Sequence, residues 1–326
     1  MSNKTICSAF WHHTNIRSNN RVFPCCRFKY PVAEFDGDVD KILKLPVYDE
    51  LRRKAKAGEH IAGCQKCYDE EAESGSNKPY RTNEYLAPST RLEFNSKYDC
   101  KTISLDFLEV GFDNICNLMC VMCSPEWSNS WGQKLYPELP PKQVIKDTDD
   151  FKNVPDTIQT VLFLGGEPLM TNRHIRFLET FKNIGNLTAI YNTNGTFAIT
   201  DRIKISLDKC KEVNFFISVD GYGETNDRVR EGSSWDKVTS FISQCEQYGY
   251  KFQITSAIHT ENIMDLPKLV DWIKDNNYDW RPTLVTYPQK LDVSNLDDTN
   301  KNIIKDYLNN IDIPFKTNII KHLDIS

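Results

Sequence analysis

The stretch Asp113-Asn-Ile-Cys-Asn-Leu-Met-Cys-Val-Met-Cys-Ser-Pro125 carries three cysteines, Cys116, Cys120 and Cys123, in a C-x₃-C-x₂-C arrangement. A structural zinc site takes four ligands, and a four-iron cluster ordinarily takes four cysteine thiolates. Three cysteines in one short loop would leave one iron of such a cluster open to another ligand. Buried structural cysteines, or part of a zinc knuckle, are the alternatives.

Apolar runs and helical patterns alternate after this loop. The apolar runs cover residues 160–168, 188–195, 213–221 and 252–258, and each of the first three ends in turn residues. Continuous apolar runs are typical of strands covered on both faces, as in parallel sheets. Helical patterns cover residues 173–184, 235–248 and 266–276. This order predicts βαβ units and an α/β fold with a parallel barrel or sheet.

Polar residues gather where the predicted strands end. They are Gly165-Gly166-Glu167, Asn192 and Asn194, and Ser218 and Asp220. Functional groups of parallel α/β proteins collect at the carboxyl ends of the strands, so we expect these residues to share a site with the cysteine loop. Plain Gly- or Asn/Asp-containing turns are the alternative for each motif.

Together, the triad and these strand ends resemble the radical S-adenosylmethionine (SAM) superfamily over residues 100–290. The resemblance implies a partial (β/α)6 TIM-like barrel that holds a four-iron (4Fe-4S) cluster, with SAM on the open iron. It assigns the SAM ammonium to Gly165, Gly166 and Glu167, and the ribose and methionyl part to Asn192, Asn194, Ser218 and Asp220. Arg228 or Arg230 is expected to hold the SAM carboxylate, and Ile258 to pack near the adenine. Met122 stands where the family usually has an aromatic residue before the third cysteine.

Five more cysteines lie in the first 90 residues: Cys7, Cys25, Cys26, Cys64 and Cys67. Their surroundings resemble pieces of the SPASM or twitch auxiliary-cluster modules, which in most relatives follow the barrel. The resemblance implies a second four-iron cluster on Cys7, Cys25, Cys64 and Cys67, with Cys26 as the alternate for Cys25. Zinc on the same four cysteines is the open alternative. The adjacent His12 and His13 are expected at the surface.

Length and composition suggest one large domain and a smaller one. We expect a cysteine-rich module at 1–90, the barrel at 100–290 and a helical tail at 291–326, with a helix at 299–311 and a short segment at 314–325. The net charge of −5, from 40 basic and 45 acidic residues, argues against a mainly electrostatic nucleic-acid binder. No apolar run approaches the roughly 20 residues of a membrane span. Eleven cysteines without a secretion signal favour metal ligation in the cytoplasm.

The resemblance also implies a reaction. A donor such as flavodoxin or ferredoxin supplies an electron to the cluster. The reduced cluster then cleaves SAM to methionine and a 5′-deoxyadenosyl radical, and this radical abstracts hydrogen from the substrate. Relatives with auxiliary modules commonly modify peptides or proteins, so a peptide or protein substrate is the leading expectation. There are two alternatives. The protein is a radical SAM enzyme that acts on a small molecule or nucleotide, or it is a non-catalytic iron–sulfur binding protein.

The position of the auxiliary centre separates two possibilities. If it serves the reaction, Cys64 and Cys67 should border the same cavity as Gly165 and Ser218. If it only supports folding, it should pack outside the helices.

Overall fold

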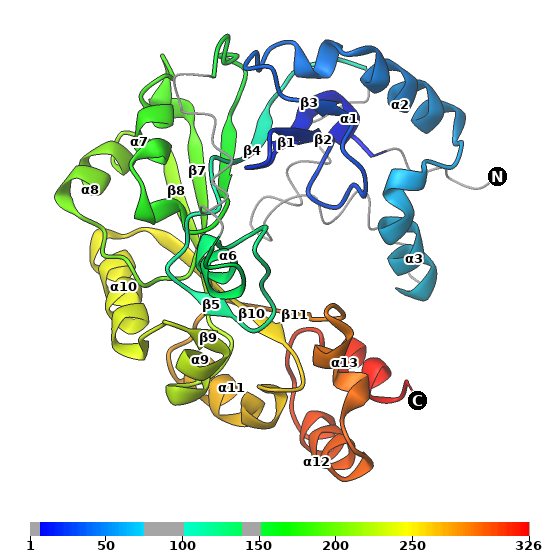
Figure 1. Ribbon diagram of the computed structural model, residues 1–326, viewed down its shortest axis with the longest axis vertical. Coiled ribbons are helices and arrows are strands. Elements are labelled where there is room, and N and C mark those ends of the chain that lie inside the picture. Colours follow the sequence, from blue (N-terminus) through cyan, green and yellow to red (C-terminus); the bar gives the residue numbers. More distant parts are fainter. Residues whose placement is uncertain (1–6, 75–100, 139–150, 326) are drawn as a thin grey trace.

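A computed structural model describes residues 7–74, 101–138 and 151–325 of the chain. The main sheet has nine strands (Figure 1). In spatial order they are β11 (Trp280–Leu284), β10 (Lys251–Ile258), β8 (Glu212–Ser218), β7 (Thr188–Thr193), β6 (Thr160–Leu164), β4 (Phe107–Gly111), β1 (His13–Ile16), β2 (Arg21–Phe23) and β3 (Ala33–Glu34). Neighbours from β11 to β1 run parallel, and β2 and β3 add an antiparallel end. The predicted α/β fold with a parallel sheet is therefore confirmed.

Helices link the parallel strands. They are α6 (Asn129–Leu135), α7 (Arg173–Leu178), α8 (Asp201–Leu207), α9 (Glu224–Val229), α10 (Trp235–Tyr248) and α11 (Leu266–Asp275). Helices α7, α8 and α10 lie along one side of the sheet (Figure 1). The predicted helix at 235–248 has the bounds of α10. Helix α7 ends at Leu178, short of the predicted residue 184, because a turn and the 3₁₀ segment Ile184–Asn186 lead into β7.

The helix-covered face of the sheet carries a row of aromatic rings. Phe163 of β6 stacks on Tyr191 of β7 with ring centroids 4.7 Å apart, and Tyr191 stacks on Phe215 of β8 at 5.3 Å. All three side chains are fully buried in the largest apolar core. This stacking fixes the register of the three central strands, because a one-residue slip would turn the rings to the other face.

The opposite face of the same strands is apolar too. Phe107, Ile190 and Phe216 are buried in a second core together with Phe10 and Trp11 from the N-terminal segment. The strands are thus covered by helices on one face and by N-terminal residues on the other. This double cover explains why their sequences are continuously apolar rather than alternating.

The N-terminal segment belongs to the same sheet, although the sequence predicts a module of its own. It contains α1 (Ala9–His12), α2 (Pro46–Ala57) and α3 (Gln65–Ser74), and its strand β1 pairs in parallel with β4. The expectation that His12 and His13 lie at the surface is wrong, because both are buried. His12 Nδ1 lies 2.9 Å from Asp106 Oδ2, and His13 Nε2 lies 3.3 Å from Glu109 Oε1. Acidic partners from the neighbouring chain segment allow both imidazoles to be buried.

Two helices close the chain at its C-terminal end, α12 (Asp298–Asn309) and α13 (Lys316–Leu323). The Asp297 carboxylate accepts a hydrogen bond from the Asn300 amide at 2.9 Å and so caps α12. Both helices match segments predicted from the sequence. Within the described residues, every helix is too short or too polar to cross a membrane.

Candidate cysteine-cluster and cofactor site

The three cysteines of the loop after β4 line one cavity. Cys116 and Cys120 are buried, and Cys123 is half-buried. The cavity has a volume of about 410 Å³ and lies at the carboxyl ends of the parallel strands. Of the residues predicted for the site, those in its lining are Cys116, Cys120, Cys123, Gly165, Gly166, Asn192, Asn194, Ser218, Arg230 and Cys26. Three-dimensional folding thus brings together groups spread over more than 200 residues of sequence.

Helix α6 and the residue before it hold the cysteine loop by its backbone. Ser130 Oγ donates to the carbonyl of Cys116 at 2.6 Å, and Trp131 Nε1 donates to that of Cys120 at 2.9 Å. Ser128 Oγ donates to the Leu118 carbonyl at 2.6 Å. These three hydrogen bonds fix the backbone of the loop at Cys116, Leu118 and Cys120. The Ser128–Trp131 run gives no motif signal, and sequence reasoning missed it.

A short two-stranded sheet ties the loop to the far side of the cavity. Strand β5 (Met119–Cys120) pairs antiparallel with β9 (Arg230–Glu231), and the Val121 amide donates to the Val229 carbonyl at 2.9 Å. This pairing carries Arg230 to the cysteines, where its Nη1 lies 3.7 Å from Cys120 Sγ.

Gly165 and Gly166 allow the end of β6 to dock against the cysteine loop. The Gly166 amide donates to the Asp113 carbonyl at 3.0 Å, and the Glu167 amide to the Ile115 carbonyl at 2.7 Å. A Cβ atom on Gly166 would lie 2.2 Å from the Ile115 oxygen. Gly165 has a φ of +127°, a conformation that side chains disfavour. The glycine pair is therefore needed for close packing of two backbones, whatever it binds.

Glu167 lies behind the cavity wall rather than in it. Its carboxylate is buried and accepts hydrogen bonds from the Leu169 amide at 3.0 Å, Thr193 Oγ1 at 2.8 Å and the Asn194 amide at 2.7 Å. Burial raises its pKa to about 7 against the lowering effect of these hydrogen bonds. The residues that line the cavity do not include Glu167. This geometry therefore does not favour the predicted direct contact between Glu167 and a bound ammonium.

The ends of β7 and β8 supply amide and hydroxyl groups to the cavity. Asn194 Nδ2 donates to Asn117 Oδ1 at 3.0 Å and lies 3.9 Å from Cys116 Sγ. Asn192 and Ser218 also line the cavity. These polar groups can meet a ligand that sits next to the cysteines.

Of the two candidate arginines, the structure brings Arg230 to the cavity and leaves Arg228 outside it. Arg230 Nε donates to Asp220 Oδ2 at 2.7 Å, and Asp220 Oδ1 accepts from the Ala257 amide. Asp220 is thus a buried anchor for Arg230 and does not line the cavity. Arg228 instead donates to the carbonyl of Glu261 at 2.7 Å.

Ile258 does not line the cavity, contrary to the prediction. It is buried in the large core on the helix-covered face, whereas its neighbour Ala257 lines the cavity. The reason is the alternation of side chains along β10, which sends adjacent residues to opposite faces.

The N-terminal cysteines are split between two environments. Cys7 and Cys25 are buried in the core on the inner face of the sheet, with Cys64 packed against it, and Cys67 is also buried. Burial raises the pKa of Cys25 well above its ordinary value, and the nearby Cys26, Cys7 and Cys64 thiols add to this shift. Cys26 lines the cavity of the cysteine triad, whereas Cys64 and Cys67 do not. The expectation that Cys64 and Cys67 border this cavity is therefore wrong.

The chemistry of the triad can be compared with what a cluster needs. A four-iron cluster takes cysteine thiolates and attaches each of them to a different iron. Within the described ranges, no group of three His, Cys, Asp or Glu side chains is arranged to hold a single metal ion. Burial raises the pKa of Cys116 to about 11 and that of Cys120 to about 12. A cationic iron centre would offset this cost of forming thiolates. The triad and its cavity thus fit such a cluster.

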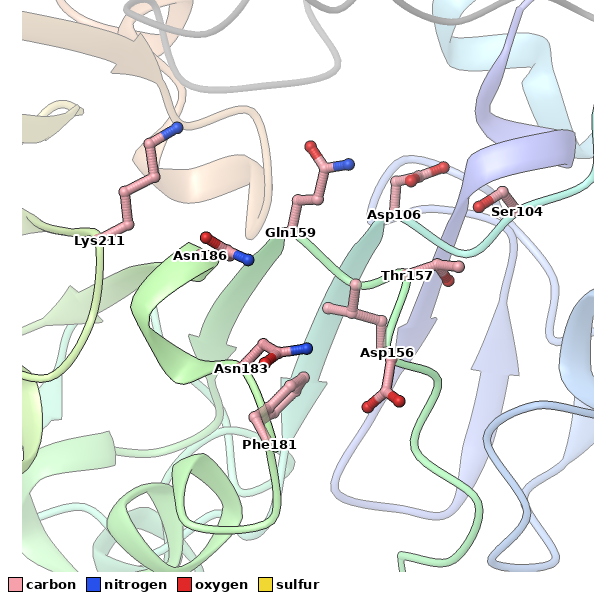
Figure 2. A pocket seen from close by; sticks show the side chains of 10 residues that line it. Ser104, Asp106, Asp156, Thr157, Gln159, Phe181, Asn183, Asn186 and Lys211 are labelled. Atoms are coloured by element: carbon pink, nitrogen blue, oxygen red, sulfur yellow. The ribbon is translucent and has the colours of Figure 1, made fainter.

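A second cavity, of about 530 Å³, lies at the other end of the strands (Figure 2). Its lining includes residues at the starts of three strands: Gln159 directly precedes β6, Asn186 lies just before β7, and Lys211 directly precedes β8. Its lining includes no cysteine. Because ligands of parallel α/β proteins bind at the carboxyl ends of the strands, the cavity with the cysteine triad is the better functional site.

Sequence reasoning missed Asn15, Arg17 and Trp127, which also line the cavity of the triad. Asn15 and Arg17 come from β1 and the turn after it, and Trp127 follows the cysteine loop. The pairing of β1 with β4 puts the first two there, and no local motif marks that pairing.

Comparison with known proteins matches the same part of the chain. The family model described as the radical SAM superfamily matches residues 111–273, which is half of the chain. An Fe-coproporphyrin III synthase from Methanosarcina barkeri (strain Fusaro / DSM 804) is 27% identical over 164 residues, 49% of this chain and 39% of the relative. A GTP 3′,8-cyclase from Clostridium perfringens (strain 13 / Type A) is 27% identical over 175 residues, 51% of each chain. The chain thus spans about half of these relatives' length or less.

Solved structures show a partial likeness. The structure described as "Native anSMEcpe with bound AdoMet" has a TM-score of 0.47 at 18% identity, covering 63% of this chain and 62% of that one. Streptococcus suis SuiB bound to precursor peptide SuiA has a TM-score of 0.46 at 17% identity, covering 75% of this chain and 58% of that one.

Proposed function

Because this chain belongs to the radical SAM superfamily, we propose that it is a radical SAM enzyme in which Cys116, Cys120 and Cys123 hold a four-iron cluster and SAM lies beside them in the cavity. The observation that carries this proposal is that the triad, the Gly165-Gly166 turn and the ends of β7 and β8 all line one cavity. On this proposal, the six strands β4, β6, β7, β8, β10 and β11 correspond to the partial barrel of the family. When bound, the cluster and SAM supply reductive cleavage of a carbon–sulfur bond and removal of a hydrogen atom from the substrate.

The residues around the cavity would bind and orient SAM. The backbone at Gly165 and Gly166 can approach the amino group closely, since neither residue carries a Cβ. Arg230, fixed by Asp220 at 2.7 Å, is our choice over Arg228 for the carboxylate. Glu167 is assigned a positioning role, because its hydrogen bonds hold Thr193 and Asn194 in place. The side chains of Asn192, Asn194 and Ser218 can meet the ribose and methionyl part.

The N-terminal cysteines would hold an auxiliary centre of the SPASM or twitch kind. Cys7, Cys25, Cys64 and Cys67 are the proposed ligands, and the packing of Cys25 near Cys7 and Cys64 supports the set. We favour a second four-iron cluster because of the resemblance to the auxiliary-cluster modules, and zinc on the same four cysteines is the alternative. On this proposal, residues 1–90 form the module that holds this centre, residues 100–290 form the part that binds SAM, and residues 291–326 form a helical tail. Residues 75–100 lie outside the described part.

A peptide or protein is the proposed substrate, with flavodoxin or ferredoxin as the kind of electron donor. A small molecule is the second candidate, because the names of the curated relatives describe GTP and coproporphyrin chemistry. Of the N-terminal cysteines, the cavity lining includes Cys26 and leaves out the four proposed ligands, so the first candidate is favoured by analogy alone.

The test of the proposed function is SAM cleavage. Protein purified without oxygen, reconstituted with iron and sulfide and reduced with dithionite should release 5′-deoxyadenosine and methionine from SAM. The Cys116→Ala/Cys120→Ala/Cys123→Ala variant should release neither. Cys210→Ala is the matched control, since Cys210 lies outside the cavity lining, and it should cleave SAM like the parent. Absence of 5′-deoxyadenosine from the parent protein with full iron content would refute the proposal.

The auxiliary centre is tested by iron content. The parent protein should hold about twice the iron of one four-iron cluster, and the triple variant about half of the parent's. Cys25→Ala should remove the auxiliary iron and keep the cluster of the triad. Zinc in place of the second set of irons would decide for the structural-zinc alternative.

A further inference from the structure

The part of the cavity wall that β1 and the following turn contribute has no task in the proposed SAM site. Asn15, Arg17 and Cys26 line the cavity together with the triad. All three come from the N-terminal segment, outside the residues that match the family model. This wall is therefore a feature of this chain's own N-terminal segment.

Asn15 presents an unsatisfied acceptor at this wall. Its side chain is 2% exposed, and its Nδ2 donates to the buried Glu109 carboxylate. Its Oδ1 is buried and has no hydrogen-bond partner among the described residues. A buried carbonyl oxygen without a partner is costly, and a ligand N–H in the cavity would remove that cost. Glu109, which also lies 3.3 Å from His13 Nε2, holds the Asn15 amide group through its Nδ2 and so orients Oδ1.

Arg17 presents an unneutralised cation two residues further on. Its guanidinium lies 3.7 Å from the centroid of the Phe23 ring and donates to the Cys26 carbonyl at 3.3 Å. No carboxylate in the described ranges forms an ion pair with it. Arg230, across the cavity, is instead neutralised by Asp220 at 2.7 Å. The ring and the carbonyl fix the guanidinium plane, and its remaining N–H donors can bind an anion in a bidentate manner.

We propose that Asn15 and Arg17 form a substrate-recognition site for a carboxylate with an adjacent amide N–H, the pattern of a peptide C-terminus or an acylated amino acid. The inference rests on the proposed function and names the substrate class of the same cavity. Arg17 directly follows β1, two residues after Asn15, and both side chains line the cavity. A ligand that pairs with both therefore needs an N–H and a carboxylate close to each other. Arg17 binds the carboxylate, and Asn15 Oδ1 accepts the N–H.

The test is a binding measurement with small probes on cluster-reconstituted, SAM-loaded, unreduced protein under argon. Saturation-transfer NMR gives the dissociation constants of N-acetylglycine, its neutral amide N-acetylglycinamide, and N-acetylsarcosine, which lacks the N–H. N-acetylglycine should bind about ten-fold more tightly than the neutral amide, as expected for loss of a charge-assisted contact. N-acetylsarcosine should bind several-fold more weakly than N-acetylglycine.

Two matched arginine variants decide whether Arg17 carries this preference. Arg17→Gln should abolish the preference for carboxylate over amide and leave the iron content unchanged. Arg228→Gln, at an exposed arginine outside the cavity lining, should keep the preference. Equal affinities for all three probes, or no binding of any, would overturn the inference.

The SAM carboxylate is the other source of the same chemistry. If Arg17→Gln weakens SAM binding about ten-fold in equilibrium dialysis and leaves the probe preference intact, Arg17 serves SAM and the substrate site is refuted. These measurements need no turnover, so they fail independently of the SAM-cleavage test. Protein that cleaves SAM but binds the probes alike would refute this inference alone.

Discussion

At the scale of single residues, Gly166 decides how closely the end of β6 approaches the cysteine loop. Its missing side chain leaves room for the carbonyl of Ile115, which would lie 2.2 Å from a Cβ atom. The neighbours are backbone atoms of Asn114 and Ile115, so they cannot turn aside as a flexible side chain would. The two amide hydrogen bonds that join this turn to Asp113 and Ile115 depend on the same approach.

Gly166→Ala should therefore destabilise the protein by about 1–3 kcal/mol, the usual cost of overpacking, and weaken SAM binding. Urea unfolding under argon measures the first effect, and equilibrium dialysis the second. Gly185→Ala is the control, because the nearest atom to its Cβ is 3.9 Å away. It should change stability by no more than about 0.5 kcal/mol. An unchanged unfolding midpoint for Gly166→Ala would contradict the proposed close packing.

At the scale of elements, helix α7 is attached to the sheet through a buried histidine. His174 is 1% exposed, and its Nδ1 lies 2.9 Å from the hydroxyl of Tyr191 on β7. Burial lowers its pKa to about 3, from an ordinary value of 6.5. The folded protein therefore keeps this imidazole neutral at pH values where the unfolded chain binds a proton.

This shift predicts a loss of stability as pH falls. Above pH 6.5, His174 is neutral in both the folded and the unfolded protein, so its contribution to stability is complete. Below pH 6.5, the unfolded chain binds a proton at this histidine before the folded protein does, and the free energy of unfolding falls. The stability of the parent protein relative to His174→Gln should fall by about 2 kcal/mol between pH 7 and pH 5. Urea unfolding at pH 7, 6 and 5 measures it. A pH-independent difference for His174→Gln would show that burial does not control this group.

At the scale of the whole molecule, the N-terminal segment and the parallel strands share one sheet and one core. Phe10 is 2% exposed, and it lies in the same apolar cluster as Phe107 and Phe216 of the strands. The segment therefore covers the inner face of the sheet and carries cysteines and cavity residues at the same time. Its unfolding should expose that face and disrupt both proposed metal centres.

Phe10→Ala should lower the stability of the entire chain by about 3–5 kcal/mol and keep a single unfolding transition. Far-UV circular dichroism and tryptophan fluorescence, followed in the same urea titration, should give coincident curves. Tyr30→Ala, at a side chain that is 49% exposed, is the control and should stay within about 0.5 kcal/mol of the parent. An early fluorescence transition separate from the main loss of secondary structure would show instead that the N-terminal segment folds as an independent module.

The sequence by itself determined the features that depend on local order. The spacing of the cysteine triad, the apolar runs that became β6, β7, β8 and β10, and the bounds of α10 follow from neighbouring residues alone. Periodicity and turn chemistry act within a few residues, so they are readable without the fold. The same holds for the gathering of polar groups at strand ends, since parallel strands align those ends.

Only the tertiary structure decided which of these side chains meet. It brought Arg230 to Cys120 across 110 residues of sequence and left Arg228 outside, and it turned Ala257 rather than Ile258 to the cavity. It also placed Asn15 beside Glu109, 94 residues away, through the pairing of β1 with β4. Such contacts depend on strand order and on which face a residue occupies, and a shift of one residue reverses the face. Local sequence therefore supplied the groups of the site, and long-range packing selected the ones that line it.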